Sequence, residues 1–255
     1  MAALICILSC RLFEYSPYEI PTRDRGDGWI AGQLARIAGT DGRERMFSFA
    51  VISDIHDAYD ELEGAVSSIN ADTSIRFTFV TGDLTQYGLN KEFEWVDQRL
   101  ERLRAPYFPV IGNHDALANG AEIFRNLYGP LDHSFTYRGA KFILFNDNIW
   151  EFSLNLPDTA WLESELSTSD SLRVFPIAHI PPWGDQITPV METMLIDLFS
   201  KHRAALCIFG HQHHYHLGLH DGIRMPYVIA DNVADRNYVK VAVADSAVSV
   251  KRIFY

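Results

Sequence analysis

The stretch MFSFAVISDIH, residues 46–56, decides how this chain folds. Its first seven residues form an apolar run of strand length, which predicts a buried β-strand from Met46 to Ile52. Asp54 and His56 follow this strand at alternate positions, so both side chains can face the same point. The stretch therefore predicts a strand whose carboxyl end presents a carboxylate and an imidazole.

The same arrangement recurs four times further along the chain. Each time a strand-like run is followed at once by Asp, Asn or His, and glycine opens three of the four junctions. The runs and the residues after them are Arg76–Thr81 with Gly82-Asp83, Tyr107–Ile111 with Gly112-Asn113-His114-Asp115, Leu172–Ala178 with His179, and Ala204–Phe209 with Gly210-His211-Gln212-His213. Glycine lets the backbone turn sharply away from a strand, and ligand crevices of open α/β sheets form at the carboxyl ends of their strands. The five junctions therefore predict one site.

The predicted site combines carboxylate, imidazole and amide donors without a thiolate. Its members are Asp54, His56, Asp83, Asn113, His179, His211 and His213. This mixed oxygen and nitrogen set favours Mn, Fe, Zn, Co or Ni ions and disfavours an iron–sulfur cluster or a structural zinc knot. The donors suffice for two adjacent ions, and two-metal sites are typical of enzymes that hydrolyse phosphate esters. We expect most of the other histidines to be solvated; they are His133, His202, His214, His216 and His220.

The motifs D-x-H, G-D, G-N-H-[DE], H and G-H-x-H, in this order, resemble those of the calcineurin-like metallophosphoesterases. The resemblance runs from Met46 to His213 and extends into the last strands. It implies an α/β fold, a four-layer α/β/β/α sandwich of two mixed β-sheets flanked by helices. It also implies two divalent or trivalent transition-metal ions, one held by Asp54, His56, Asp83 and His213 and the other by Asp83, Asn113, His179 and His211.

The same resemblance places His114 beside the ions as a general acid. The ions would activate a bridging hydroxide for in-line attack on phosphorus. The departing alkoxide would take its proton from His114, since imidazole titrates near neutral pH, and Asp115 is expected to hold this ring protonated and correctly turned. The chain is thus predicted to hydrolyse a phosphomonoester or a phosphodiester. A noncatalytic metal-binding interaction module on the same scaffold is the alternative, although such modules usually lose ligands or the acid, which this chain retains.

The residues after Gly82-Asp83 separate the chain from two subgroups of that family. Protein serine/threonine phosphatases continue as G-D-x-x-D-R-G, whereas residues 82–88 here are GDLTQYG, without an arginine. Purple acid phosphatases have a tyrosine ligand three residues after the bridging aspartate, where this chain has Gln86, with Tyr87 one position later. The segment is most similar to bacterial phosphodiesterases and broad-specificity phosphoesterases.

Strands and helices alternate over one predicted domain, residues 46–255, preceded by an N-terminal tether or extension, residues 1–45. A length of 255 residues with 47% hydrophobic residues suits a single α/β unit. Predicted helices span 58–69, 90–104, 121–128, 159–166 and 189–201, and further strands span 134–138, 141–146, 227–230, 238–243 and 247–254. The boundary signals are Asn90 and Thr188 as N-caps, Pro189 at N1, Gly129 after a helix, and Gly139-Ala140 as a hairpin turn.

The net charge of -11 disfavours a nucleic-acid partner bound through its backbone. Two cations would still make the cleft locally positive, so a small phosphate ester is the expected partner. Two loops carry aromatic residues, 148–158 with Trp150 and Phe152 and 179–188 with Trp183. These rings could stack on a nucleobase or an aryl leaving group, but we favour a role in capping the hydrophobic core.

The amino terminus raises the question of location. Residues 1–9 are apolar, and ILSC at 7–10 resembles a lipoprotein cleavage box, which would put a lipid anchor on Cys10 and the protein at a membrane outside the cytoplasm. A positive n-region is missing and the apolar stretch is short; a start upstream of Met1 would account for both. The lipoprotein interpretation is preferred, with a cytoplasmic protein as the alternative. Cysteines at 6, 10 and 207 do not form a disulfide framework, and position 207 falls in a buried strand pattern.

Overall fold

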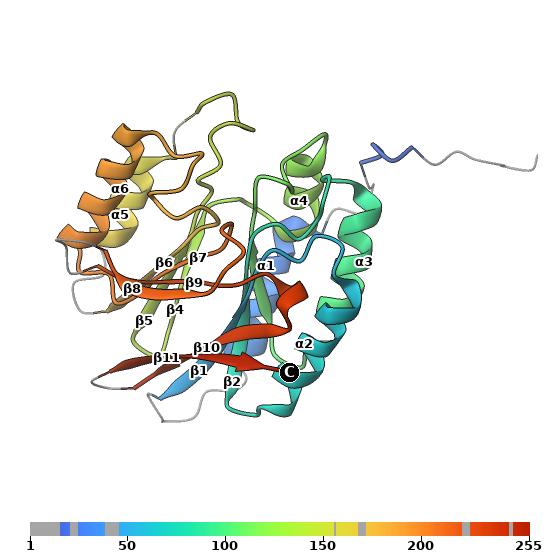
Figure 1. Cartoon of the computed structure of the whole chain (residues 1–255), viewed down its shortest axis with the longest axis horizontal. Coiled ribbons are helices and arrows are strands. Elements are labelled where there is room, and N and C mark those ends of the chain that lie inside the picture. The colour runs from blue at the N-terminus through green and yellow to red at the C-terminus, as the bar shows by residue number, and fades with distance from the viewer. Residues whose placement is uncertain are drawn as a thin grey trace, which may run out of the picture.

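Two mixed β-sheets pack face to face at the centre of the computed structural model (Figure 1). The structure describes residues 16–20, 25–38, 46–155, 157–167, 172–220, 225–244 and 247–255. The first sheet has the order β11-β10-β1-β2-β3, with β1 (Phe47–Ile52), β2 (Ile75–Thr81), β3 (Tyr107–Val110), β10 (Asn237–Val243) and β11 (Val248–Phe254). The second has the order β4-β5-β6-β7-β9-β8, with β4 (His133–Tyr137), β5 (Ala140–Leu144), β6 (Arg173–Ile177), β7 (Cys207–Phe209), β8 (His216–Leu219) and β9 (Pro226–Ile229).

Helices cover the outer face of each sheet (Figure 1). The first sheet is covered by α1 (Gly26–Ala38), α2 (Tyr59–Ala71), α3 (Asn90–Leu100) and α4 (Gly120–Tyr128). The second is covered by α5 (Thr159–Ser167) and α6 (Pro189–Lys201), and a short 3-10 helix, η1 (Val233–Asp235), precedes β10. The predicted four-layer α/β/β/α sandwich is therefore confirmed.

Burial on both faces explains why the first strand is apolar apart from Ser48. Side chains alternate across a strand. Phe49 and Val51 therefore lie in the core between the sheets, whereas Ala50 and Ile52 face the helices. The inter-sheet core is rich in phenylalanine, and Phe49 contacts Phe142 and Phe175 of the opposite sheet edge to face at centroid distances of 5.5 and 5.8 Å. Each such ring contributes about 2–3 kcal/mol by leaving water, so this layer holds the two sheets together.

Parallel pairing brings the five junctions to one edge of the sandwich. In the first sheet β1, β2 and β3 are parallel neighbours, and in the second sheet β5, β6, β7 and β9 are. Antiparallel strands lie outside these parallel blocks. The carboxyl ends of β1, β2 and β3 therefore share one edge of the first sheet, and those of β6 and β7 share one edge of the second. The contact between Asp83 and His179 shows that these two edges lie on the same side of the molecule.

Helix α1 corrects the predicted boundary at Met46. Trp29 packs against Tyr107 and Tyr128 at centroid distances of 5.2 Å each, and Ile37 reaches the core between the sheets. Residues 25–38 therefore belong to the packed unit and do not form a tether. The glycines of this segment obscured a helical apolar stripe that includes Trp29, Leu34 and Ile37.

Local signals were right at two boundaries. Thr188 caps α6, where its hydroxyl accepts from the Met191 N–H at 3.3 Å, and Gly129 follows α4 with φ +90°. Residue 207 is a free, buried cysteine, as predicted.

Two other boundary predictions were wrong. Asn90 is the first residue of α3, and Leu89 is its N-cap, because the Leu89 N–H donates to the Glu92 carboxylate at 3.1 Å. The helix also ends earlier than predicted, at Leu100. The hairpin turn is Arg138-Gly139, one residue before the predicted pair, since both of these residues adopt positive φ, +47° and +80°.

The predicted lipid anchor at Cys10 lies outside the described residues. Within the described ranges, no helix combines the length and apolarity needed to cross a membrane.

His133 differs from the solvated histidine that we expected. Both of its ring nitrogens are shielded from solvent. Burial lowers the pKa of this imidazole from 6.5 to about 4. The folded protein therefore keeps His133 neutral at pH values at which the unfolded chain would protonate it.

This difference in pKa predicts that the free energy of unfolding falls as the solution becomes acidic. Because the folded pKa lies below the unfolded one, the contribution is complete above about pH 6.5 and falls by up to about 3 kcal/mol as the pH drops to about 4. His133→Gln should flatten the pH dependence of the unfolding free energy over this window, measured by urea denaturation. His214→Gln replaces an exposed histidine and should follow the parent profile. A His133→Gln profile as steep as that of the parent would contradict the assignment.

Candidate metal centre

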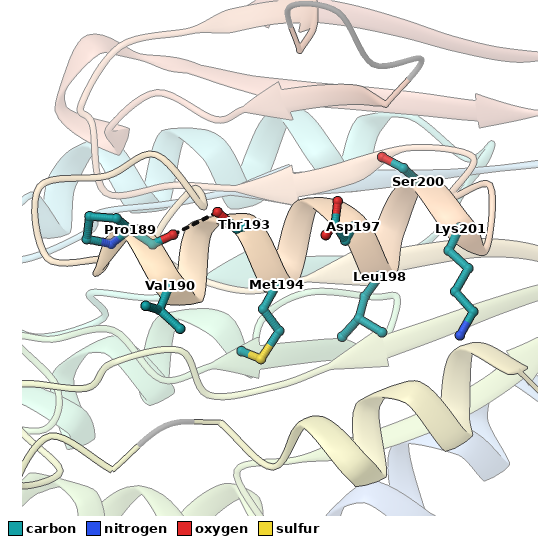
Figure 2. A pocket seen from close by; sticks show the side chains of 8 residues that line it. All are labelled: Pro189, Val190, Thr193, Met194, Asp197, Leu198, Ser200 and Lys201. Atoms are coloured by element: carbon teal, nitrogen blue, oxygen red, sulfur yellow. Dashed lines mark hydrogen bonds between the residues drawn. The ribbon is translucent and has the colours of Figure 1, made fainter.

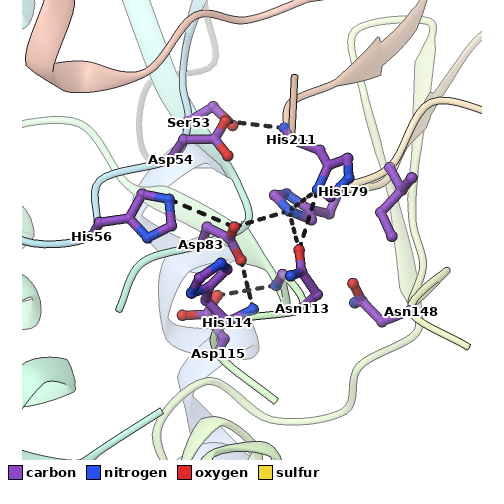
Figure 3. Close-up of polar contacts among 12 residues, drawn as sticks. Ser53, Asp54, His56, Asp83, Asn113, His114, Asp115, Asn148, His179 and His211 are labelled. Carbon is purple, nitrogen blue, oxygen red and sulfur yellow. Dashed lines mark hydrogen bonds and ion pairs between the residues drawn. The ribbon is translucent and has the colours of Figure 1, made fainter. Parts of the chain in front are cut away.

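Loops from both sheets bring the predicted ligands together at the edge where the parallel strands end. Figure 3 labels all of these ligands except His213. Ligand atoms of Asp54, His56, Asp83 and His213 lie within 4.8 Å of one another, and so do those of Asp83, His179 and His211. The Asn113 Oδ1 lies 3.0 Å from His179 Nε2 and 3.2 Å from His211 Nδ1, so it joins the second group. All seven predicted residues thus converge, and Asp83 belongs to both groups.

The backbone is strained where it aims these side chains. Five of the seven residues adopt the left-handed region, which non-glycine residues rarely occupy. Their φ values are 51° for Asp54, 49° for His56, 51° for Asp83, 68° for His211 and 51° for His213. This clustering indicates that the rest of the fold forces the ligands into position.

The three junction glycines are required by close approach. A Cβ on Gly82 would lie 2.3 Å from His179 Nδ1, and one on Gly112 would lie 2.1 Å from the Asp83 Oδ1. A Cβ on Gly210 would lie 1.9 Å from the Ser53 hydroxyl. Each glycine therefore lets one strand end approach a ligand-bearing loop of another.

The first group lies partly at the surface. His213 Nε2 lies 3.2 Å from Asp54 Oδ1 and 3.3 Å from His56 Nε2, while His56 Nε2 lies 3.7 Å from Asp83 Oδ2. The His213 side chain is 49% exposed, whereas the Asp54 side chain is fully buried. Hydrogen bonding to Asp54 raises the pKa of His213, and burial lowers the pKa of His56.

The second group is centred on a fully buried imidazole. His179 Nδ1 lies 2.7 Å from the Thr81 carbonyl and must carry the hydrogen there, since a carbonyl only accepts. Its Nε2 faces Asp83 Oδ2 at 3.2 Å. Burial alone would raise the pKa of Asp83 and lower that of His179, but their mutual attraction lowers the first to about 2 and raises the second to about 10.

The ligand atoms are arranged to bind a transition metal and not to form hydrogen bonds with one another. Nitrogen faces nitrogen at 3.3 Å between His56 and His213, and again between His179 and His211. At most one hydrogen can lie between each pair, whereas a cation can accept both lone pairs. Carboxylate, amide and imidazole ligands on rigid strand ends are also the ligand types that such metals prefer.

The predicted contact between Asp115 and His114 is wrong. Asp115 is fully buried and accepts from the Leu84 N–H at 3.1 Å, the Gly112 N–H at 3.0 Å, and the Thr85 N–H and hydroxyl at 2.8 Å each. It therefore clamps the loops after β2 and β3 together. Burial is the main cause that raises the pKa of Asp115 to about 7, and repulsion from Asp83 is the second.

A backbone carbonyl orients His114 instead. Its Nδ1 lies 2.8 Å from the Gln86 oxygen, and its ring packs edge to face on His56 with centroids 4.7 Å apart. Its backbone N–H donates to Asp83 Oδ1 at 2.9 Å. The neighbouring Tyr87 side chain is exposed, so no tyrosine points into the group from this segment.

Supporting residues that the sequence analysis did not single out surround the ligands. The buried Asp147 accepts from the Ile180 N–H at 3.1 Å, directly after His179, and Asn148 donates to the Ile111 carbonyl at 2.9 Å. Their signal was the polar run Asn146-Asp147-Asn148 after an apolar strand. Asp185 lies 3.0 Å from His211 Nε2.

The aromatic residues of the two loops behave differently. Trp183 packs against Phe209 and Tyr227 at centroid distances of 6.2 and 4.5 Å, and Phe152 packs on the core under the first sheet. The capping role is therefore confirmed for these two rings. Trp150 is 56% exposed and does not cap the core.

A concave surface lies on the outer side of α6 (Figure 2). This open groove has a volume of about 1080 Å³ and is lined by Pro189, Val190, Thr193, Met194, Asp197, Leu198, Ser200 and Lys201. None of the predicted site residues lines it. The chemistry suggested by the motifs therefore belongs to the strand ends.

Comparison with known proteins agrees with this geometry. Residues 47–215 match the model of the calcineurin-like phosphoesterases. The chain belongs to this family. The matched segment contains all seven candidate ligands and His114. Family membership thus indicates a metal-dependent phosphoesterase.

Individual relatives are distant. A probable cyclic nucleotide phosphodiesterase of Xenorhabdus bovienii is 21% identical over 184 residues, which cover 62% of this chain and 69% of that protein. A dimetal phosphatase from Danio rerio has a TM-score of 0.66 at 15% identity, and the match covers 81% of this chain and 95% of the phosphatase chain. GAP50, the anchor in the inner membrane complex of Plasmodium, has a TM-score of 0.63 at 14% identity, with 82% and 84% covered. At these identities the two solved structures show the shared fold alone.

Gly82 provides a test of the close approach between β2 and His179. In Gly82→Ala the new methyl group must displace the imidazole, in addition to the strain of an alanine at φ +91°. Gly139→Ala is the matched control, because Gly139 also has positive φ, +80°, but nothing lies within 4 Å of its Cβ position. We expect the control to lose about 1–2 kcal/mol of unfolding free energy and to retain bound metal. Gly82→Ala should lose more stability and much of its metal, and equal behaviour of the two variants would contradict this account.

Proposed function

We propose that the protein is a dinuclear metal-dependent hydrolase of phosphoric esters. The observation that carries the proposal is the shared position of Asp83, whose carboxylate lies in both ligand groups. One group would hold an ion with Asp54, His56 and His213, and the other with Asn113, His179 and His211. Ions bound there would supply an activated water at neutral pH and neutralise the phosphoryl oxygens.

The proposed general acid is His114. Its Nδ1–H is engaged by the Gln86 carbonyl, so the opposite ring nitrogen, Nε2, is the one available to a leaving group. The bond from its backbone N–H to Asp83 keeps the residue beside both ligand groups. Asp115 supports this arrangement indirectly, because it ties the loop of Thr85 to the loop of His114.

A small phosphodiester is the substrate that we infer. The GDLTQYG segment after β2 resembles that of bacterial phosphodiesterases, and the Xenorhabdus bovienii relative is described as a probable cyclic nucleotide phosphodiesterase. A net charge of -11 argues against a large polyanionic partner such as a nucleic acid. A noncatalytic interaction module remains the competing function that experiments should test.

Metal content and turnover of model esters test this proposal together. The parent protein should bind two ions per chain and hydrolyse bis-nitrophenyl phosphate faster than nitrophenyl phosphate. Asp83→Asn should lower metal-dependent turnover by more than about 100-fold, since even outer-shell partners of metal ligands are worth 10–100-fold. Asp57→Asn changes an exposed aspartate next to His56 and should have little effect. Bound metal without turnover on any ester in a broad panel would favour the interaction module.

The acid role of His114 predicts a dependence on the leaving group. His114→Ala should slow hydrolysis of alkyl esters by about 100-fold or more, the usual contribution of a general acid. It should slow nitrophenyl esters far less, because nitrophenolate leaves without a proton. His214→Ala is the matched control, since His214 also places Nδ1 2.8 Å from a backbone carbonyl but is exposed. Equal losses on both ester types, measured as kcat/KM, would rule out the role.

A further inference from the structure

His211 uses both of its ring nitrogens, and they face different surroundings. Nδ1 points into the metal centre, 3.2 Å from Asn113 Oδ1 and 3.3 Å from His179 Nε2. Nε2 points the other way and lies 3.0 Å from the Asp185 carboxylate. The Asp185 side chain is 83% exposed, whereas that of His211 is 13% exposed.

We propose that Asp185 is a positioning residue that prepares His211 to bind the second metal ion. Both ring nitrogens face an oxygen that only accepts, the Asp185 carboxylate at Nε2 and the Asn113 amide oxygen at Nδ1. The carboxylate is charged and is therefore the stronger acceptor, so it favours the hydrogen of a neutral His211 ring on Nε2. The lone pair is then on Nδ1, directed at the other members of the second group. A negative charge at Nε2 also makes Nδ1 a better donor, as in the carboxylate–histidine–metal arrangements of other metalloproteins.

The contact links the metal centre to a loop outside the sheets. His179, the other imidazole of this group, is oriented by the Thr81 carbonyl at the end of β2, which cannot move independently of the sheet. Asp185 instead lies between β6 and α6. The Trp183 ring anchors this loop on Phe209, which immediately precedes the loop that carries His211. One ligand of the second ion therefore depends on the position of a surface loop.

Stability alone does not explain the pair. An exposed ion pair contributes little to stability, and Asp185 is mostly in water. A ring held in one tautomer matters much more to a metal ligand, because only the lone pair binds. The expected effect of Asp185 is therefore on metal affinity, with little change in unfolding free energy.

Calorimetric titration of the metal-free full-length protein with Zn²⁺ or Mn²⁺ tests this inference, which rests on the proposed two-metal site. In Asp185→Ala we expect the second ion to bind about 10–100-fold more weakly and the first ion to be unaffected. Asp185→Asn should lose less, because its amide oxygen can still accept from Nε2. Asp57→Asn removes an exposed charge beside the first group and should leave both affinities unchanged.

The tautomer provides a readout that does not require bound metal. Imidazole ¹⁵N spectra of the metal-free protein, recorded at rising pH until the His211 ring is neutral, should show the Nε2–H form for His211 and a mixture of tautomers in Asp185→Ala. Unchanged affinities and unchanged tautomer in Asp185→Ala would overturn the inference. An equal loss in Asp57→Asn would also overturn it, because general attraction of cations would then explain the effect. Failure of the parent to bind a second ion would instead count against the proposed dinuclear function.

Discussion

The rest of the metal centre depends on one buried carboxylate, that of Asp83. It follows β2, the central member of the β1-β2-β3 block, so the ligand-bearing loops after β1 and β3 lie on either side of it. One of its oxygens faces His179 and His56, and the other accepts from the His114 backbone. A charge with so little access to water is tolerated only with such partners. The partners are therefore as necessary to the fold as to the chemistry.

The contact between Asp83 and His179 joins the two sheets. Asp83 follows a strand of the first sheet, whereas His179 follows β6 of the second. The layer between them sets their separation, and Phe79 of β2 lies against Phe142 of β5 with centroids 5.3 Å apart. A smaller or looser core would let the sheets shift, and the 3.2 Å contact at the edge would be lost. Packing of phenylalanine in the interior thus controls the geometry of polar groups at the rim.

The sequence was sufficient to predict where the ligands meet but not how they are held. Apolar runs and glycine junctions predicted strand ends that converge, because pairing of buried strands follows general rules. The hydrogen bond from His114 to the Gln86 carbonyl was not predictable, since every residue has a carbonyl and only the path of the loop selects one. The expected contact of Asp115 with His114 fails for a related reason: the two residues are adjacent in sequence, but the Asp115 side chain lies against the other loop.

Helix α1 was missed for a different reason. Its glycines at 26, 28 and 32 are weak helix formers, and the helix is stabilised by contacts of Trp29 with residues about 80–100 positions away. The glycines argue against such a helix, whereas its apolar stripe and its contacts with distant residues favour it. A sequence window contains the stripe but not the distant contacts.

The left-handed backbone at five ligand positions places the metal ligands but lowers the stability of the folded protein. Each such residue costs about 1–3 kcal/mol relative to relaxed backbone. Glycine or asparagine would adopt these angles more easily than histidine or aspartate does. Selection for thermostability alone would therefore favour replacing residues such as His56 and His213 and would remove the ligands in doing so. Engineering of a more heat-resistant form should leave these positions untouched and seek its gains in the surface helices.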